Sequence, residues 1–325
     1  MSDAELKLIM MNEVQEQDVK WLWHPYIPFG KITVVQGDPG DGKTTFVLAL
    51  TALITNGKGM PESIGDTEPS LVIYQTAEDG LADTIKPRLT ALGAACSRVV
   101  VIDESEKDLT LIDERIEQAI RETKAKLFII DPLQAYLGIN VDMHRANEIR
   151  PVFKSLAGVA ERTGCAIMIL GHMNKMSGAV KGLYRGLGSI DIAAAARSIL
   201  LIGRVKDSPT MRVMAHLKSS LAQEGQSIAF DIGGDTGRFA WNGAHDISAE
   251  ELLNGGGQGR AAQATKKNKA MDMLQELLMD GAMPCQDIYE YFDDADIGRR
   301  TVDNAKKEKG ILSFKKGAIW YWKLP

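Results

Sequence analysis

The segment that most constrains this chain covers residues 37–44 and matches the pattern G-x-x-x-x-G-K-[ST] at every position. The apolar, β-branched run 31–36 before it predicts a buried strand, and the run 45–54 after it predicts a helix. In this context the glycines let backbone N–H groups turn toward an anion, and the helix N-terminus adds its positive end. The alternative is a glycine-rich turn with a chance lysine. With both flanking elements in place, we predict a site for a nucleoside triphosphate.

Two side chains of this segment have predicted roles in the chemistry. Lys43 is expected to reach the β- and γ-phosphates, and the Thr44 hydroxyl is expected to hold Mg²⁺. ATP and Mg²⁺ are therefore the expected cofactors. The predicted nucleotide-binding set along this stretch is Gly37, Asp38, Pro39, Gly40, Asp41, Gly42, Lys43, Thr44 and Thr45.

Composition limits the remaining possibilities. A length of 325 residues allows one large domain with a small one, or two medium domains. No apolar run approaches membrane-spanning length and no secretory leader is evident, so we expect a cytoplasmic location and no membrane partner. The three cysteines lie far apart and are expected to be reduced. With a net charge of −5, any nucleic-acid surface must be local.

Acidic residues follow two further predicted strands. The run 70–76 is followed by Glu78, which either stabilises the start of the next helix or orients the water that attacks the γ-phosphate. The apolar run 127–130 is closed by Asp131, as expected for the carboxylate of the Mg²⁺ shell. An aromatic and proline-rich lead-in over 21–28 either packs on the sheet or touches the base of the nucleotide.

The next strand, 165–170, is followed by His172, which is either structural or a sensor of the γ-phosphate. The glycine-rich stretch 176–189 carries Lys181 and Arg185 and predicts an exposed loop. It is either an ordinary flexible loop or a segment that touches a polyanion or a neighbouring subunit's phosphate.

Three short strands are predicted over 198–202, 211–217 and 226–230, as antiparallel strands that finish the sheet. Lys218 stands at the end of the middle one. Strands alternating with helices upstream predict an α/β fold with a mostly parallel sheet flanked by helices.

The composition changes near the C-terminus. We predict an ATPase domain over 1–245, a flexible linker over 246–265, and a small α+β winged-helix domain over 266–325. The small domain would contain three helices and a hairpin. Its basic face either binds DNA or is a solvated surface on a protein-docking domain. The predicted DNA contacts are Arg299, Arg300, Asn304 and Lys307 on the third helix, and Lys315 and Lys316 on the wing.

With these motifs placed, the first 245 or so residues resemble the RecA-like hexameric ATPases, and most closely the RepA-type replicative helicases of plasmids, phages and integrative elements. The order and spacing of the set are specific, although its single members are not. The segments that carry the resemblance are Trp21-Leu22-Trp23-x-Pro25, the phosphate loop, Thr76-Ala77-Glu78-Asp79, Ile130-Asp131-Pro132-Leu133, Gly171-His172-x-Asn174-Lys175 and Tyr184-Arg185-Gly186.

The resemblance implies roles within one subunit. By it, Glu78 is similar to the catalytic glutamate and Asp131 to the Mg²⁺ carboxylate. His172 resembles the γ-phosphate sensor, and Arg88 matches an arginine of the nucleotide site.

The resemblance also implies roles between subunits. Arg185 is similar to the arginine finger that enters a neighbouring subunit's site, and Lys218 to the lysine that acts in trans. The chain departs from the pattern at Ser220, where many hexameric helicases carry an arginine.

The function implied is a hexameric, Mg²⁺-ATP-driven DNA motor, with single-stranded DNA passing through the ring. A replicative helicase of a mobile element is the first hypothesis. The second is an ATP-switched DNA-binding regulator or loader that separates no strands, which Ser220 favours. A recombination mediator is a third possibility that no sequence feature indicates.

Overall fold

The structure is a computed structural model that describes residues 8–138, 141–143, 145–172, 190–206, 208–233, 238–253, 270, 271, 273–279, 281–294, 297, 299–317 and 319–324. The chain divides into two compact units, Met1–Glu250 and Glu251–Pro325, so the division falls within the predicted linker 246–265. Within the described ranges, no helix combines the length and the apolar character needed to cross a membrane.

Nine strands of the described residues form one sheet in the first unit, in the order β11-β10-β9-β8-β3-β7-β6-β4-β5. The strands from β8 to β5 are parallel, and β9, β10 and β11 add an antiparallel edge. The predicted α/β fold, a mostly parallel sheet with antiparallel strands at one edge, is confirmed. The strands are β3 (Ile32–Gly37), β4 (Val72–Thr76), β5 (Val99–Val100), β6 (Leu127–Asp131), β7 (Ala166–His172), β8 (Ser198–Arg204), β9 (Met211–Ser219), β10 (Ser227–Gly233) and β11 (Arg238–His245).

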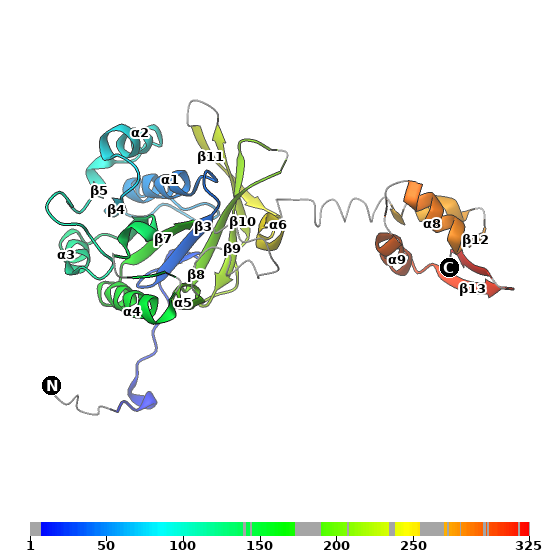
Figure 1. Ribbon diagram of the computed structural model, residues 1–325, viewed down its shortest axis with the longest axis horizontal. Helices are drawn as coiled ribbons and strands as arrows, with labels where there is room; N and C mark the ends of the chain where they lie inside the picture. The colour runs from blue at the N-terminus through cyan, green and yellow to red at the C-terminus, as the bar shows by residue number, and fades with distance from the viewer. Residues whose placement is uncertain are drawn as a thin grey trace. The chain divides into compact units, whose positions relative to one another are not determined.

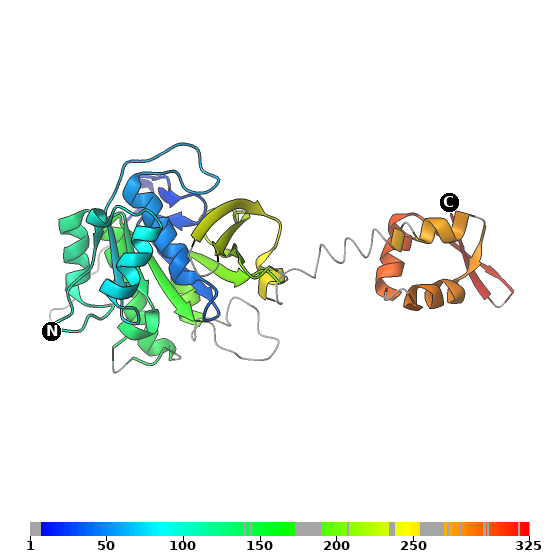
Figure 2. The same ribbon diagram turned by 90° about the horizontal axis from the view of Figure 1, so that it is seen from above.

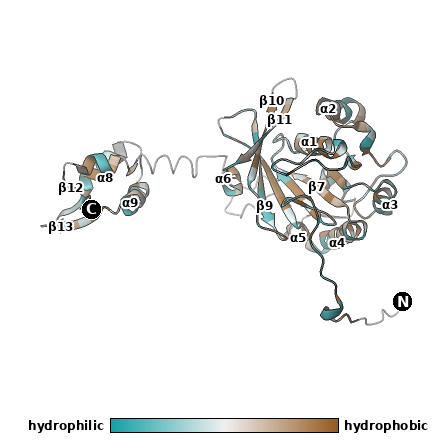
Figure 3. Ribbon diagram, turned by 180° about the vertical axis from the view of Figure 1, so that it is seen from behind, coloured by the Kyte–Doolittle hydropathy of each residue, from teal (hydrophilic) through white to brown (hydrophobic). Residues whose placement is uncertain are grey.

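The central strands are apolar on both faces because helices cover both. Every residue of β3 and β6 is buried, as expected for parallel strands enclosed between two helical layers. Figure 3 shows the brown of hydrophobic residues in the strands around β7, in the middle of the sheet. In the sequence, the strands in the middle of this sheet therefore appear as short, continuous apolar runs and not as alternating apolar and polar residues.

Helix α1 (Lys43–Asn56), the π-helical turn η2 (Leu81–Ile85) and α2 (Lys86–Ala91) pack on one face of the sheet. In Figure 2 the helix drawn in blue, α1, runs along the middle of the sheet. Helices α3 (Glu114–Thr123), α4 (Ala146–Thr163) and α5 (Ile190–Ala195) pack on the other face, as Figure 1 shows. The short elements are η1 (Met11–Glu13), η3 (Cys96–Arg98), η4 (Leu133–Tyr136) and α6 (Ala249–Leu253).

The aromatic lead-in forms two short strands, β1 (Trp21–Trp23) and β2 (Ile27–Pro28), and belongs to the core. Trp23 is 1% exposed, lies 6.4 Å from Phe46 between ring centroids, and donates from Nε1 to the Pro61 carbonyl at 3.1 Å. Tyr26 is also buried. The packing interpretation is confirmed for these two rings.

The antiparallel edge differs from the prediction in two ways. The first of the three predicted strands, β8, is parallel to its neighbour β3 on one side and antiparallel to its neighbour β9 on the other. A fourth strand, β11, was not predicted. Its pairing with β10 shifts register between Ala229 and Phe230, beside Gly243, whose φ is 81°. That irregularity interrupts the period-two pattern that would have indicated a strand.

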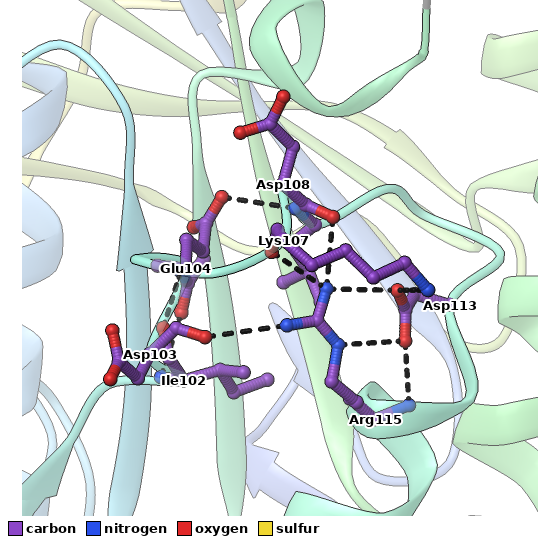
Figure 4. A network of polar contacts seen from close by, with 9 residues as sticks. Ile102, Asp103, Glu104, Lys107, Asp108, Asp113 and Arg115 are labelled. Atoms are coloured by element: carbon purple, nitrogen blue, oxygen red, sulfur yellow. Dashed lines mark hydrogen bonds and ion pairs between the residues drawn. The ribbon is translucent and has the colours of Figure 1, made fainter.

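A polar network orders the loop that joins β5 to α3. The Arg115 guanidinium donates to the carbonyls of Lys107 at 3.0 Å and Asp108 at 2.9 Å, as Figure 4 shows. It also donates to the Asp113 carboxylate at 3.0 Å. Hydrogen bonding from Arg115 to this carboxylate lowers the pKa of Asp113 to about 2. Glu104 of the same loop is bonded to Gln75 in β4. The loop is therefore tied to the strand that precedes Glu78.

The second unit contains helical residues at 270, 271 and 273–279, then α8 (Cys285–Asp294) and α9 (Arg299–Glu308). A small sheet has the order β12-β14-β13, with β12 at Met283–Pro284, β13 at Leu312–Lys316 and β14 at Ile319–Lys323. Ten buried apolar residues among those described give this unit a core of its own. Strand β12 was not predicted.

Burial of His216 on β9 makes stability depend on pH. Its Nδ1 accepts the Gly225 N–H at 3.0 Å, so a neutral ring carries its proton on Nε2, 3.1 Å from Ser198 Oγ. Burial lowers the pKa of His216 from 6.5 to about 4. The unfolded ring therefore gains a proton near pH 6.5 while the folded ring stays neutral. Its contribution is fully present above pH 6.5 and is lost as the pH falls toward 4, by about 3 kcal/mol in total.

We expect His216→Gln to remove this component, because glutamine does not titrate. Urea unfolding of both proteins between pH 8 and pH 4 measures it. The wild type should lose about 3 kcal/mol more than the variant over this range, and the exposed His24→Gln is the matched control. Parallel profiles for wild type and His216→Gln would contradict the assignment.

Candidate functional site

The phosphate loop, residues 37–44, joins the end of β3 to the start of α1. Gly40 and Gly42 have φ values of 79° and 93°, which favour glycine. A Cβ on Gly37 would stand 2.3 Å from the Ile202 carbonyl oxygen. The pattern of glycines is therefore required by the backbone path and by the close approach of β8.

Lys43 lies across this loop. Its side chain is buried, and Nζ donates to the carbonyl oxygens of Gly37 at 2.8 Å and Asp38 at 3.0 Å. Burial lowers the pKa of the Lys43 amine, while the charges of nearby carboxylates, chiefly Asp41 and then Asp131, oppose that shift. The amine is held by two carbonyls of the loop itself, which phosphate oxygens can replace.

The Thr44 hydroxyl and the Asp131 carboxylate meet at the end of β6. Thr44 Oγ1 donates to Asp131 Oδ2 at 2.8 Å, and the Tyr74 hydroxyl donates to the same oxygen at 2.8 Å. Burial raises the pKa of Asp131, and the two hydrogen bonds lower it. The hydroxyl and carboxylate oxygens fit Mg²⁺, which usually takes one or two carboxylates together with water and phosphate oxygens. Among the described residues, no three His, Cys, Asp or Glu side chains are grouped to hold a metal alone.

Glu78 lies two residues beyond β4, at the edge of the sheet that carries Asp131. Thr76 and Asp131 are partners in the β4–β6 pairing, so the segment after Thr76 leaves the sheet beside the Asp131 carboxylate. Burial is the largest influence on the pKa values of Lys43, which is lowered, and Asp131, which is raised, and the charge of Glu78 makes a smaller upward contribution to both. These positions are compatible with the catalytic role that the resemblance implies.

Arg88 of α2 pairs with the neighbouring acid. Its Nη1 lies 3.2 Å from Asp79 Oδ2, and its side chain is 47% exposed. Arg88 is thus paired with the residue that follows Glu78, on the side of the sheet that α1 covers.

His172 is the last residue of β7, and its Cα pairs with that of Gly37. The backbone therefore places it directly beside the first glycine of the phosphate loop, although its side chain lies outside the described residues. Lys181 and Arg185 also lie outside the described residues.

Lys218 lies at the opposite end of the sheet from the phosphate loop. In the β8–β9 pairing it is the partner of Ile199, near the start of β8, whereas Arg204 at the end of β8 reaches the loop. Lys218 Nζ donates to the carbonyls of Ala193 at 2.6 Å and Ala196 at 2.8 Å, at the end of α5. Lys218 therefore lies away from the phosphate loop of its own chain.

The predicted DNA contacts of the second unit are partly described. Arg299 is exposed and lies over the Tyr289 ring at 5.0 Å, and Lys307, Lys315 and Lys316 are exposed. Arg300 and Asn304 belong to α9, but their side chains lie outside the described residues.

Three of the described residues at the site were missed from the sequence: Tyr74, Arg204 and Arg212, whose Cγ would lie 3.9 Å from a Cβ placed on Gly42. Arg204 follows an apolar strand run, as Asp131 does, and that pattern could have identified it. Tyr74 and Arg212 lie within strands and have no such pattern.

Fold and site together define a RecA-like P-loop ATPase. The chain belongs to the AAA domain family, whose sequence model matches residues 7–178, just over half of the chain. The phosphate loop and Asp131 both lie within that range.

The chain is also similar to individual proteins. It is 32% identical over 155 residues to the DNA repair protein RadA of Halalkalibacterium halodurans and 24% identical over 155 residues to that of Bacillus subtilis. Each match covers 47% of this chain and 30% of the relative. A DnaB-like replicative helicase, solved in a study of its interactions with primase, has a TM-score of 0.51 and 15% identity, over 66% of this chain and 58% of that one. This likeness shows a shared fold.

Proposed function

We propose that the chain is a Mg²⁺-ATP-dependent, oligomeric DNA motor, a RepA-like replicative DNA helicase of a mobile element. The observation that carries the hydrolytic part is the 2.8 Å contact between Thr44 Oγ1 and Asp131 Oδ2. It joins the phosphate loop to the acidic end of β6, the pair of oxygens that a Mg²⁺–triphosphate site needs.

The geometry supports the division of roles that we propose within one subunit. Lys43 and the N–H groups of the loop bind the phosphates, while Thr44 and Asp131 hold Mg²⁺, which neutralises charge on the phosphate oxygens. Glu78 orients the attacking water, and His172, beside Gly37, senses the γ-phosphate.

We propose that a neighbouring subunit completes the site. Lys218 lies at the end of the sheet away from its own phosphate loop, which suits a residue that acts in trans. Arg185 is proposed as the arginine finger. Repeated head-to-tail contacts of this kind form a ring where the rotation between subunits closes, and we propose a hexameric ring.

DNA is the proposed partner. RadA is a DNA repair protein by its name, and the structural relative is a DnaB-like replicative helicase. Single-stranded DNA would contact Lys181 in the ring. The second unit, proposed as a winged helix, would bind duplex DNA through the basic side chains of α9 and of the β13–β14 hairpin. Such phosphate contacts should weaken steeply with salt.

One observation favours a second candidate, an ATP-switched DNA-binding regulator or loader. Position 220, two residues after Lys218, is a serine whose N–H donates to the Arg197 carbonyl at 3.0 Å. A site without an arginine there has one fewer charge to stabilise the transferring phosphoryl group.

A forked duplex with a labelled strand separates the two candidates. The helicase proposal expects strand displacement that requires ATP, together with hydrolysis stimulated by single-stranded DNA. Lys43→Ala under the same conditions is the control for contaminating helicases. Strong DNA-stimulated hydrolysis without displacement would reject the helicase and support the regulator.

A further inference from the structure

The phosphate loop contains two acids, which is an electrostatic problem for a loop that must hold a triphosphate. Asp38 is exposed, and the side chain of Asp41 is 14% exposed. Asp41 Oδ2 accepts the Asp38 N–H at 3.0 Å, so its charge lies within the loop itself. Burial raises the pKa of the Asp41 carboxyl, the Asp38 N–H bond lowers it, and the charges of Arg204 and Lys43 also lower it.

Arg204, the last residue of β8, contacts this loop from the neighbouring strand. Its Nη2 donates to the Gly40 carbonyl at 2.7 Å, and its Nε donates to Asp41 Oδ1 at 3.3 Å. The guanidinium therefore binds the backbone of the loop and its inner carboxylate together. Neither contact uses Lys43, which is bonded to Gly37 and Asp38.

A second arginine, Arg212, lies on the strand next to Arg204. Arg212 of β9 is the register partner of Arg204, so the two side chains leave the sheet on the same face. Arg212 is 6% exposed, and its Nε has no hydrogen-bond partner among the described residues. Its Cγ would lie 3.9 Å from a Cβ placed on Gly42. Two cations placed opposite each other destabilise a sheet unless anions lie beside them. Asp41 is bonded to Arg204, and the charges of Asp41 and Asp231 both act on Arg212.

We propose that Arg204 is a positioning residue for the phosphate loop, which offsets the charge of Asp41 and fixes the Gly40 carbonyl so that the loop can accept a triphosphate. The inference rests on the proposed nucleotide binding and adds a group, from the same chain, that no loop motif contains. Because Arg204 acts on the loop before chemistry, its loss should change KM for ATP and leave kcat close to that of the wild type.

The test uses Arg204→Gln in the full chain. Glutamine keeps a donor for the Gly40 carbonyl and removes the charge. We expect KM for ATP to rise about threefold to tenfold, with kcat within about twofold, since Arg204 contacts the loop and makes no contact with the Thr44–Asp131 pair. Arg162→Gln is the matched control, because Arg162 is 55% exposed against 56% for Arg204 and is also paired with an acid, Glu117, at 2.6 Å.

Asp41→Asn in the Arg204→Gln background distinguishes charge compensation from a structural bond. If Arg204 offsets Asp41, removing the carboxylate should return KM most of the way to the wild-type value. An unchanged KM in Arg204→Gln, or a double variant as weak as Arg204→Gln, would overturn the proposal.

A Lys43→Ala sample separates this inference from the function on which it rests. If the wild type binds a fluorescent ATP analogue no better than Lys43→Ala, the proposed function fails. If the wild type binds and Lys43→Ala does not, an Arg204→Gln protein with wild-type KM rejects only the role of Arg204.

Discussion

Replacing Glu78 by glutamine should slow ATP hydrolysis by about 10²–10⁴-fold and leave ATP binding intact. Glu78 leaves the sheet beside Asp131, because Thr76 and Asp131 pair between β4 and β6. At that place a carboxylate can orient a water against the γ-phosphate, whereas an amide of the same shape is a poor proton acceptor. Lys43, which we propose binds the phosphates, is untouched, so the defect should appear in kcat.

Single-turnover hydrolysis and binding of a fluorescent ATP analogue measure the two effects separately. Glu68→Gln is the matched control, because Glu68 is exposed and lies before the opposite end of β4. If Glu78→Gln hydrolyses ATP at the wild-type rate, Glu78 is the helix-terminal charge that the sequence also allowed. Loss of binding together with loss of rate would assign it a structural role.

Lys43→Ala should abolish ATP binding and lower hydrolysis by about 10²–10³-fold or more, the cost of removing one preorganised donor. The Lys43 amine stands over the loop, 2.8 Å from the Gly37 carbonyl and 3.0 Å from that of Asp38. Without it, the loop keeps its N–H groups but loses the lysine amine that we propose binds the phosphates.

Phosphate release and equilibrium binding test this prediction. Lys58→Ala provides the control, since Lys58 lies just beyond the other end of α1 and forms an exposed ion pair with Asp66 at 2.9 Å. Retained turnover in Lys43→Ala would mean that the 37–44 segment is a structural turn.

Local chemistry explains why much of the candidate site could be predicted. The phosphate loop needs glycine at positions with φ of 79° and 93°, and such a requirement leaves a pattern within eight residues. Asp131 could be predicted because a buried apolar strand ends abruptly in a charge. The parallel sheet itself followed from apolar strands that alternate with helices.

Long-range register explains most of what could not be predicted. Asp41 and Arg204 are 163 residues apart, and they meet only because β8 pairs beside β3. The Arg204–Arg212 partnership depends on the β8–β9 register, and the Tyr74–Asp131 bond on neighbouring strands β4 and β6. No single segment contains this information.

The edge of the sheet at which Lys218 lies is a further feature that could not be predicted from the sequence. The sequence placed it at a strand end, which for β4, β6 and β7 means the edge with the phosphate loop. Strand β9 is antiparallel to β8, however, so its end lies at the other edge. The same pattern therefore has opposite meanings on the two halves of the sheet.

Hydrolysis by a mixture of two inactive variants tests most directly whether the site is shared between subunits. Lys43→Ala lacks a working phosphate loop but keeps Lys218. Lys218→Met keeps the loop and the aliphatic stem of the lysine but loses its amine. If Lys218 acts in trans, the mixture should hydrolyse ATP at interfaces that combine the intact loop of one variant with the intact lysine of the other. A mixture no more active than the two variants measured apart would contradict a site completed by a neighbour.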